Sequence, residues 1–62
     1  MEGNKLLRLP DVELTTGLKK SAIYERVKSG KFPQPVRLGT KSVAWRFDEV
    51  QQWIHELPRA IE

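Results

Sequence analysis

Apolar residues recur at helical spacing in three stretches of this chain. The first stretch, residues 10–16, begins with a proline and is followed by Gly17. Proline is tolerated in the first turn of a helix, where its missing N–H would have no partner, and a glycine after a helix adopts the left-handed conformation that ends it. We therefore predict a first helix over residues 10–16, with Leu9 and Val12 facing inward.

A second helix is predicted over residues 20–29, because Ile23 and Val27 lie one turn apart and form a narrow apolar stripe. Gly30 follows this pattern just as Gly17 follows the first one. Only two residues separate Gly17 from the second pattern, and so short a link forces the two helices to cross steeply. The predicted arrangement is a helix-turn-helix.

Two short segments after the second helix alternate between apolar and polar residues, which is typical of strands. They are residues 36–38 and 43–47, separated by residues 39–42, and this order predicts a two-stranded hairpin. Near the N-terminus, residues 6–9 form a short apolar stretch that either pairs as a brief strand or simply packs. The expected inward residues of the hairpin are Val36, Leu38, Val43, Trp45 and Phe47, which leaves Arg37 and Arg46 on the outer face.

A third helix is predicted to begin at Asp48 and to end before Pro58. Asp48 and Gln51 match a capping box, in which each side chain satisfies a backbone N–H near the helix start. The apolar residues of this segment follow at i, i+3, i+4 and i+7, so one face of the helix lies on the core. These residues are Val50, Trp53, Ile54 and Leu57.

The length of 62 residues is enough for one small domain, residues 1–62, and too short for a second core. There is no cysteine, so neither a disulfide nor a thiolate metal site supplements the core, and this suits a reducing cytoplasm. No apolar run approaches the roughly 20 residues of a membrane span, and the N-terminus lacks the apolar core of a signal peptide. We expect a soluble, intracellular protein.

Charge is distributed unevenly along the chain, whose net charge is +3. Residues 17–46 contain eight basic residues and one acidic residue, a net charge of +7, so the remaining residues carry −4. A basic middle between acidic ends indicates a surface that faces a polyanion such as nucleic acid. The alternative is a solvated face that happens to be rich in lysine.

The outward side of the second predicted helix supplies most of the candidate DNA contacts, because a helix placed after a tight turn usually enters the major groove. Lys20 and Lys28 are expected at phosphates, which provide affinity and register. Ser21, Tyr24 and Glu25 are expected nearer the base edges, where sequence is read. In the alternative interpretation the Tyr24 ring covers the edge of the core, and Ser21 is an ordinary surface residue.

The hairpin supplies a second group of candidates, in the role of a wing. Lys41 at the predicted tip is expected to reach a minor groove or a flanking phosphate, with Arg37 on the adjoining strand. The alternative is that charged residues on an exposed strand protect the sheet edge from aggregation. For Arg46 both roles stay open, and Arg26 is left outside the site because it lies between the inward stripe and solvent.

The other residues that could carry chemistry have simpler interpretations. Trp45 and Trp53 could stack on single-stranded nucleic acid, yet both fall on inward positions, so packing in the core is favoured. His55, the only histidine, has no cysteine or second histidine with which to share a metal. The sequence contains no catalytic triad, Walker loop or dinucleotide-binding motif. We therefore expect no enzyme activity, no metal and no cofactor.

The ordered set of these features resembles the AlpA family of phage-type regulators, within the wider group of MerR-like winged-helix proteins and excisionases. The resemblance covers residues 6–54, and it is specific because the full order of motifs is present, although each motif alone is weak. The motifs are Leu6-Leu7-Arg8-Leu9-Pro10, Thr16-Gly17-Leu18, Ile23-Tyr24, Lys28-Ser29-Gly30, Phe32-Pro33-Gln34-Pro35-Val36, Leu38-Gly39, Ala44-Trp45 and Val50-Gln51-Gln52-Trp53-Ile54.

The resemblance implies a small winged helix-turn-helix domain of the α+β class, mainly α. It also implies a cytoplasmic, nucleoid-associated protein that is encoded by a prophage or integrated element and binds double-stranded DNA. Such proteins regulate transcription, or act as excisionase-type factors that bend DNA and help an integrase. The implied protein partners are an integrase or RNA polymerase. A hypothesis of another class is a protein-interaction module whose basic face docks on an acidic partner.

The second predicted helix departs from the family pattern. The family usually has serine where this chain has Lys19, and arginine followed by leucine where it has Glu25 and Arg26. A phosphate beside Lys19 and Lys20 would compensate for the lost helix cap, because helix N-termini attract anions, and neutral drift is the alternative. Glu25 could accept a hydrogen bond from cytosine but repels phosphates, so the base sequence that relatives bind does not transfer.

MerR proteins dimerise through a long helix that is not apparent here, since Pro58 follows the third predicted helix closely. We therefore expect a monomer in solution, which could bind adjacent DNA sites cooperatively.

Overall fold

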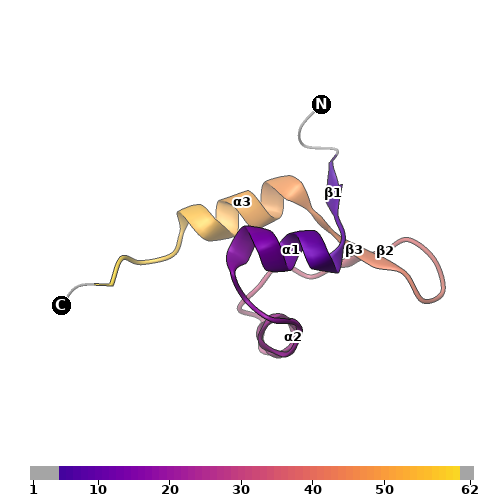
Figure 1. The fold of residues 1–62 in the computed structure, drawn as a ribbon, viewed down its shortest axis with the longest axis horizontal. Coiled ribbons are helices and arrows are strands. Elements are labelled where there is room, and N and C mark those ends of the chain that lie inside the picture. The colour runs from indigo at the N-terminus through magenta and orange to yellow at the C-terminus, as the bar shows by residue number, and fades with distance from the viewer. Residues whose placement is uncertain (1–4, 61–62) are drawn as a thin grey trace.

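The computed structural model describes residues 5–60, which form three helices and a three-stranded antiparallel sheet (Figure 1). In the sheet, β3 lies between β1 and β2. Of the two roles left open for residues 6–9, pairing as a strand is the one found for Leu6–Leu7. The elements in chain order are β1 (Leu6–Leu7), α1 (Leu9–Thr16), α2 (Lys20–Lys28), β2 (Val36–Arg37), β3 (Val43–Arg46) and α3 (Phe47–His55).

The first helix, α1, begins one residue before its predicted start and ends where predicted. Gly17 closes it with a φ of 79°, and the Gly17 N–H donates to the carbonyl of Glu13 at 2.8 Å. Only a residue without Cβ takes this left-handed conformation without strain. Val12 is fully buried and Leu9 packs against the core, so the predicted inward residues are confirmed.

The turn between α1 and α2 has the predicted helix-turn-helix arrangement. In Figure 1, α1 lies across the view while α2 is seen nearly end-on, so the two helices cross steeply. The Thr16 hydroxyl donates to the carbonyl of Val12 at 2.8 Å and accepts from the N–H of Leu18 at 3.2 Å. This single side chain therefore ties the turn to the helix before it.

The two faces of the hairpin differ from the prediction. Val36 lies opposite Ala44, and Arg37 lies opposite Val43. Directly opposed residues share a face of the sheet, and successive residues along a strand alternate between faces. Arg37 therefore lies on the Val43 face, whereas Arg46, two residues after Ala44, lies on the Val36 face. The prediction that Arg37 and Arg46 share an outer face is wrong.

The burial of β3 on both sides explains this error. Ala44 and Trp45 are adjacent, so their side chains point to opposite faces, yet both are fully buried. Both α1 and α3 pack against this strand. The residues buried on the two faces of this strand are both apolar, so alternation in the sequence cannot assign its faces.

Leu38 was predicted in the core, and this prediction is also wrong, because its side chain is 49% exposed. The paired part of β2 ends at Arg37, and residues 38–42 form a loop that projects away from the helices (Figure 1). The Leu38 N–H donates to the carbonyl of Ser42 at 2.7 Å. Leu38 therefore belongs to this loop, beyond the part of the hairpin that packs on the core.

The third helix, α3, begins at Phe47, so Asp48 lies in its first turn and Arg46 occupies the N-cap. The Phe47 N–H donates to the carbonyl of Lys5 at 2.9 Å, so pairing with the chain before β1 continues into the start of the helix. The Asp48 carboxylate accepts from the N–H of the next residue at 3.0 Å, and no side chain caps α3. The predicted capping box is wrong.

The hydrophobic core lies between the sheet and the three helices, with the loop after α2 contributing one aromatic side chain. Trp53 and Ile54 pack against it as predicted, and both are partly buried. Leu57, predicted to face inward, is 49% exposed because α3 ends at His55. The buried residues of the core cluster are Leu7, Val12, Ile23, Phe32, Trp45 and Val50.

Candidate nucleic-acid interface

The helix α2 (Lys20–Lys28) is firmly terminated at its C-terminal end. Gly30 has a φ of 78°, and its N–H donates to the carbonyl of Val27 at 3.1 Å. The Lys31 N–H donates to the carbonyl of Arg26 at 2.8 Å. These two bonds form a Schellman motif, which satisfies carbonyls that would otherwise have no partner at the helix end.

The outward face of α2 carries five of the candidate DNA contacts. Ile23 is fully buried on the opposite side. Residues at i, i+3, i+4 and i+7 share one side of a helix, and four of the candidates have this spacing. The outward face of α2 consists of Ser21, Tyr24, Glu25 and Lys28, with Lys20 at its N-terminal end, and all five residues are exposed.

Tyr24 is exposed on the outward face of α2 and also packs on the edge of the core, the alternative role that the sequence left open. Its side chain is 38% exposed, so part of the ring faces solvent. The ring also meets the buried Trp45 ring edge-on, with the centroids 5.9 Å apart and the planes at 61°. Such a contact is favourable for aromatic pairs and restricts how the ring can turn. The core therefore holds Tyr24 in one orientation on the outward face of α2.

Two lysines lie at the N-terminal end of α2. Lys19 occupies the N-cap with an extended backbone, φ −88° and ψ 165°, and no side chain caps the helix. Lys19 and Lys20 are both exposed. The free N–H groups of a helix start and the positive end of its dipole favour an anion, so this end is suited to a phosphate.

The remaining two candidates lie on the hairpin. Lys41 is exposed on the projecting loop between β2 and β3. Arg37 is exposed on β2, and its guanidinium donates to the carbonyl of Thr40 at 3.3 Å, which ties the loop back to the strand. The eight candidate residues therefore fall into two groups, six at α2 and two on the hairpin, joined by residues 29–35.

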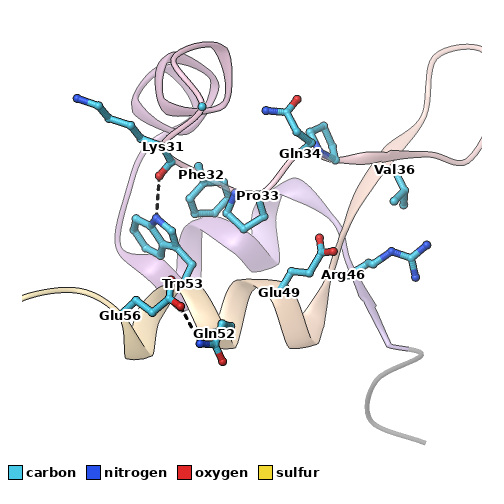
Figure 2. Close-up of a pocket in the computed structure, with 12 residues that line it drawn as sticks. Lys31, Phe32, Pro33, Gln34, Val36, Arg46, Glu49, Gln52, Trp53 and Glu56 are labelled. Atoms are coloured by element: carbon cyan, nitrogen blue, oxygen red, sulfur yellow. Dashed lines mark hydrogen bonds between the residues drawn. The ribbon is translucent and has the colours of Figure 1, made fainter.

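An open groove of about 940 Å³ lies between the segment after α2 and α3 (Figure 2). None of the eight candidate DNA contacts lines it, but Arg46 does. Trp53 forms part of its wall and donates from Nε1 to the carbonyl of Lys31 at 2.8 Å. The Gln52 side chain donates to the Glu56 carboxylate at 2.8 Å. This groove was not predicted from the sequence. The feature of the sequence that could have indicated it is the aromatic and proline-rich segment at residues 32–35.

Within residues 5–60, no three histidine, cysteine, aspartate or glutamate side chains are grouped so that they could hold a metal ion. His55 is exposed at the end of α3. In the same part of the chain, no helix has the length and apolar character needed to cross a membrane.

A helix-turn-helix with a third helix and a three-stranded antiparallel sheet is compatible with a small winged helix-turn-helix protein of the α+β class. Residues 5–59 match the family model of the prophage CP4-57 regulatory protein, AlpA. The chain therefore belongs to the AlpA family, and the resemblance predicted from its sequence is confirmed.

Two relatives illustrate this membership. The chain is 46% identical over 50 residues to ORF88, an uncharacterized protein of Enterobacteria phage P4, in a match that covers 81% of this chain and 57% of that protein. It is 33% identical over 58 residues to the DNA-binding transcriptional activator AlpA of Escherichia coli strain K12. This second match covers 84% of this chain and 83% of the activator. The chain thus spans little more than half the length of the phage P4 protein.

Proposed function

We propose that this protein is a sequence-specific transcriptional regulator that binds double-stranded DNA, with α2 in the major groove and the β2–β3 loop as a wing. The observation that carries the proposal is the outward face of α2, where four candidate side chains are exposed opposite the fully buried Ile23 and Lys20 is exposed at the N-terminal end. The E. coli relative is a DNA-binding transcriptional activator, which supports the same function here. The protein acts as one domain over residues 1–62, cytoplasmic and monomeric in solution.

Affinity comes mainly from the cationic side chains. Each phosphate that a basic residue neutralises adds about −0.9 to the slope of log affinity against log salt. If all five proposed phosphate contacts form, the slope is about −4.5, and affinity falls about 500-fold between roughly 50 and 200 mM salt. The five proposed contacts are Lys19, Lys20, Lys28, Arg37 and Lys41.

Specificity comes from the polar residues of the outward face of α2. Ser21 and Tyr24 can donate and accept hydrogen bonds at base edges. The Glu25 carboxylate can only accept, and in the major groove its natural partner is the amino group of cytosine. Because Tyr24 is braced against Trp45, its hydroxyl is presented at a fixed place on the helix. The bound sequence is therefore expected to contain a cytosine opposite Glu25.

A second candidate function is an excisionase-type factor that bends DNA and contacts an integrase, with the projecting hairpin again as the wing (Figure 1). This function uses the same surface, but part of the binding free energy goes into deforming the duplex. A transcriptional regulator would instead act with RNA polymerase. Mapping the bound genomic sites separates the two functions, because an excision factor occupies the attachment site of its element and a regulator occupies promoters.

The test of DNA binding begins with selection of bound duplexes from a random pool. Fluorescence anisotropy of a selected duplex, at two salt concentrations, then gives the slope. We expect tight binding and a slope near −4 to −5. The variant His55→Ala is the control, since His55 is exposed on α3 and should bind like the wild type. Absence of binding, or binding that does not respond to salt, would sink the proposal and favour a protein-interaction module.

A further inference from the structure

The segment between α2 and β2, residues 31–35, is held by side chains from other elements. We call this segment the connector. Pro33 and Pro35 have no backbone N–H, so the connector has few donors with which to pair. Its carbonyls accept instead from indoles: Trp45 Nε1 donates to Pro33 at 2.9 Å, and Trp53 Nε1 donates to Lys31 at 2.8 Å. The connector is therefore fixed by contacts with β3 and α3.

The Trp53 bond reaches the end of α2. Lys31, whose carbonyl accepts from Trp53, is the same residue whose N–H closes the Schellman motif on Arg26. Figure 2 shows the Trp53 indole rising from α3 toward this carbonyl, next to Phe32. The Phe32 and Trp53 ring centroids are 4.7 Å apart with the planes at 69°. One residue of α3 thus holds the C-terminal end of α2 by a hydrogen bond and an aromatic contact.

A third side chain completes this arrangement. The Gln34 side chain reaches back from the connector and donates to the carbonyl of Val27 at 2.9 Å. Val27 lies in the last turn of α2, and its carbonyl also accepts from the N–H of Gly30. The Trp53 and Gln34 bonds are both exposed, so water competes for them. The Trp45 bond is partly buried and comes from a fully buried ring, whereas the Trp53 and Gln34 bonds lie at the surface, next to the end of α2.

We propose that Trp53 and Gln34 are positioning residues for DNA recognition, which fix the end of α2 relative to α3 and the start of the wing. The inference rests on the proposed function. Phosphate contacts tolerate small displacements because a charge acts over several ångströms, whereas base-edge hydrogen bonds require distances near 3 Å. Loosening the end of α2 therefore weakens specific binding and leaves non-specific binding intact, since neither residue carries a charge.

The test uses the full chain with Trp53→Phe, which keeps an aromatic ring beside Phe32 but removes the N–H donor, and with Gln34→Ala. Gln52→Ala is the matched control, because it deletes a side-chain hydrogen bond of α3 that does not touch the connector. The first readout, without DNA, is amide hydrogen exchange at Ser29, Gly30 and Lys31. The second is affinity for a selected duplex and for a random-sequence duplex of the same length.

For both variants we expect faster exchange at the three amides. We also expect the affinity for the selected duplex to fall about two- to fivefold, while the affinity for the random duplex stays unchanged. The control should match the wild type in both readouts. Unchanged exchange overturns the positioning role directly, without reference to DNA. Faster exchange with unchanged affinity for the selected duplex overturns the link between positioning and DNA recognition. An equal loss of affinity for both duplexes overturns that link as well. If Trp53→Phe does not fold, Gln34→Ala decides by the same criteria. If the wild type binds neither duplex, the proposed function fails. The exchange rates then still test whether Trp53 and Gln34 hold the end of α2.

Discussion

Replacing Trp45 by phenylalanine should destabilise the domain far more than the same replacement at Trp53. Trp45 is fully buried, and its Nε1 donates to the carbonyl of Pro33 at 2.9 Å. Its ring also meets Tyr24 and Phe32, with centroids 5.9 and 6.5 Å away. Phenylalanine can keep part of the ring packing, but it leaves that partly buried carbonyl without its donor.

The magnitude follows from burial. A partly buried acceptor left without its donor costs about 1–2 kcal/mol, the lower part of the range for buried groups, and the smaller ring adds about 1 kcal/mol for the space it leaves. The expected loss at Trp45 is therefore about 2–3 kcal/mol. For a chain of 62 residues the whole free energy of unfolding is about 3–9 kcal/mol, so this loss is a large part of it. At Trp53 water can replace the donor, and the expected loss is about 1 kcal/mol.

The assay is urea unfolding followed by far-UV circular dichroism, with the tryptophan that remains in each variant as a fluorescent reporter. Coincidence of the two signals tests whether unfolding is a single cooperative step. The reasoning is refuted if Trp45→Phe and Trp53→Phe lose equal stability, or if Trp45→Phe unfolds at the same urea concentration as the wild type.

Five further substitutions test the helix end, the hairpin loop and the candidate DNA contacts. Gly30→Ala should cost about 1–2 kcal/mol because its φ is 78°, although the added Cβ would meet no atom within 4 Å. Gly39→Ala, at a residue without positive φ, should stay within about 0.5 kcal/mol in the same urea unfolding assay. Leu38→Thr should also change stability by less than about 0.5 kcal/mol, and a core-sized loss would mean that Leu38 is packed. In DNA titrations, Lys28→Ala should weaken binding to every duplex equally and reduce the salt slope by about 0.9, while Glu25→Ala should change the preferred sequence. Equal behaviour of these two variants would contradict the division between phosphate and base contacts.

The helices and their ends were predictable because the signals are local. The period of the apolar residues marks the inward side of α2, and the positions of Gly17 and Gly30 mark where left-handed conformations are needed. These features depend on residues within one or two turns of each other. Such local agreement explains why α1 and α2 were predicted to within a residue at each end.

The faces of the hairpin and the cap of α3 were predicted wrongly because distant segments decide them. The Phe47 N–H bonds to the carbonyl of Lys5, a partner that lies far away in the sequence. This hydrogen bond accompanies a helix that starts before Asp48, whereas the capping pattern alone predicted a start at Asp48. Similarly, Ala44 and Trp45 are buried on opposite faces of β3, against which both α1 and α3 pack, and nothing in the alternation of residues 43–47 reveals this burial.

The candidate interface was predictable as a set of exposed residues on α2, since exposure follows from the inward stripe. The hydrogen bonds that hold α2 in place were not, because Trp53 and Lys31 are 22 residues apart. The sequence predicts that Trp53 lies on the inward side of a helix, but it does not indicate which group accepts a hydrogen bond from the indole N–H. The positioning of the candidate recognition helix is therefore a tertiary property, whereas its outward face is a local one.

The most direct test of the proposed function is an NMR titration of ¹⁵N-labelled protein with a selected duplex. The account predicts that the largest amide shift changes fall in α2 and in the loop at residues 38–42. Amides on the exposed side of α3, around Gln52 and His55, should change little. The largest changes along α3 and the groove beside Trp53, with α2 unperturbed, would contradict the assignment of α2 as the recognition helix.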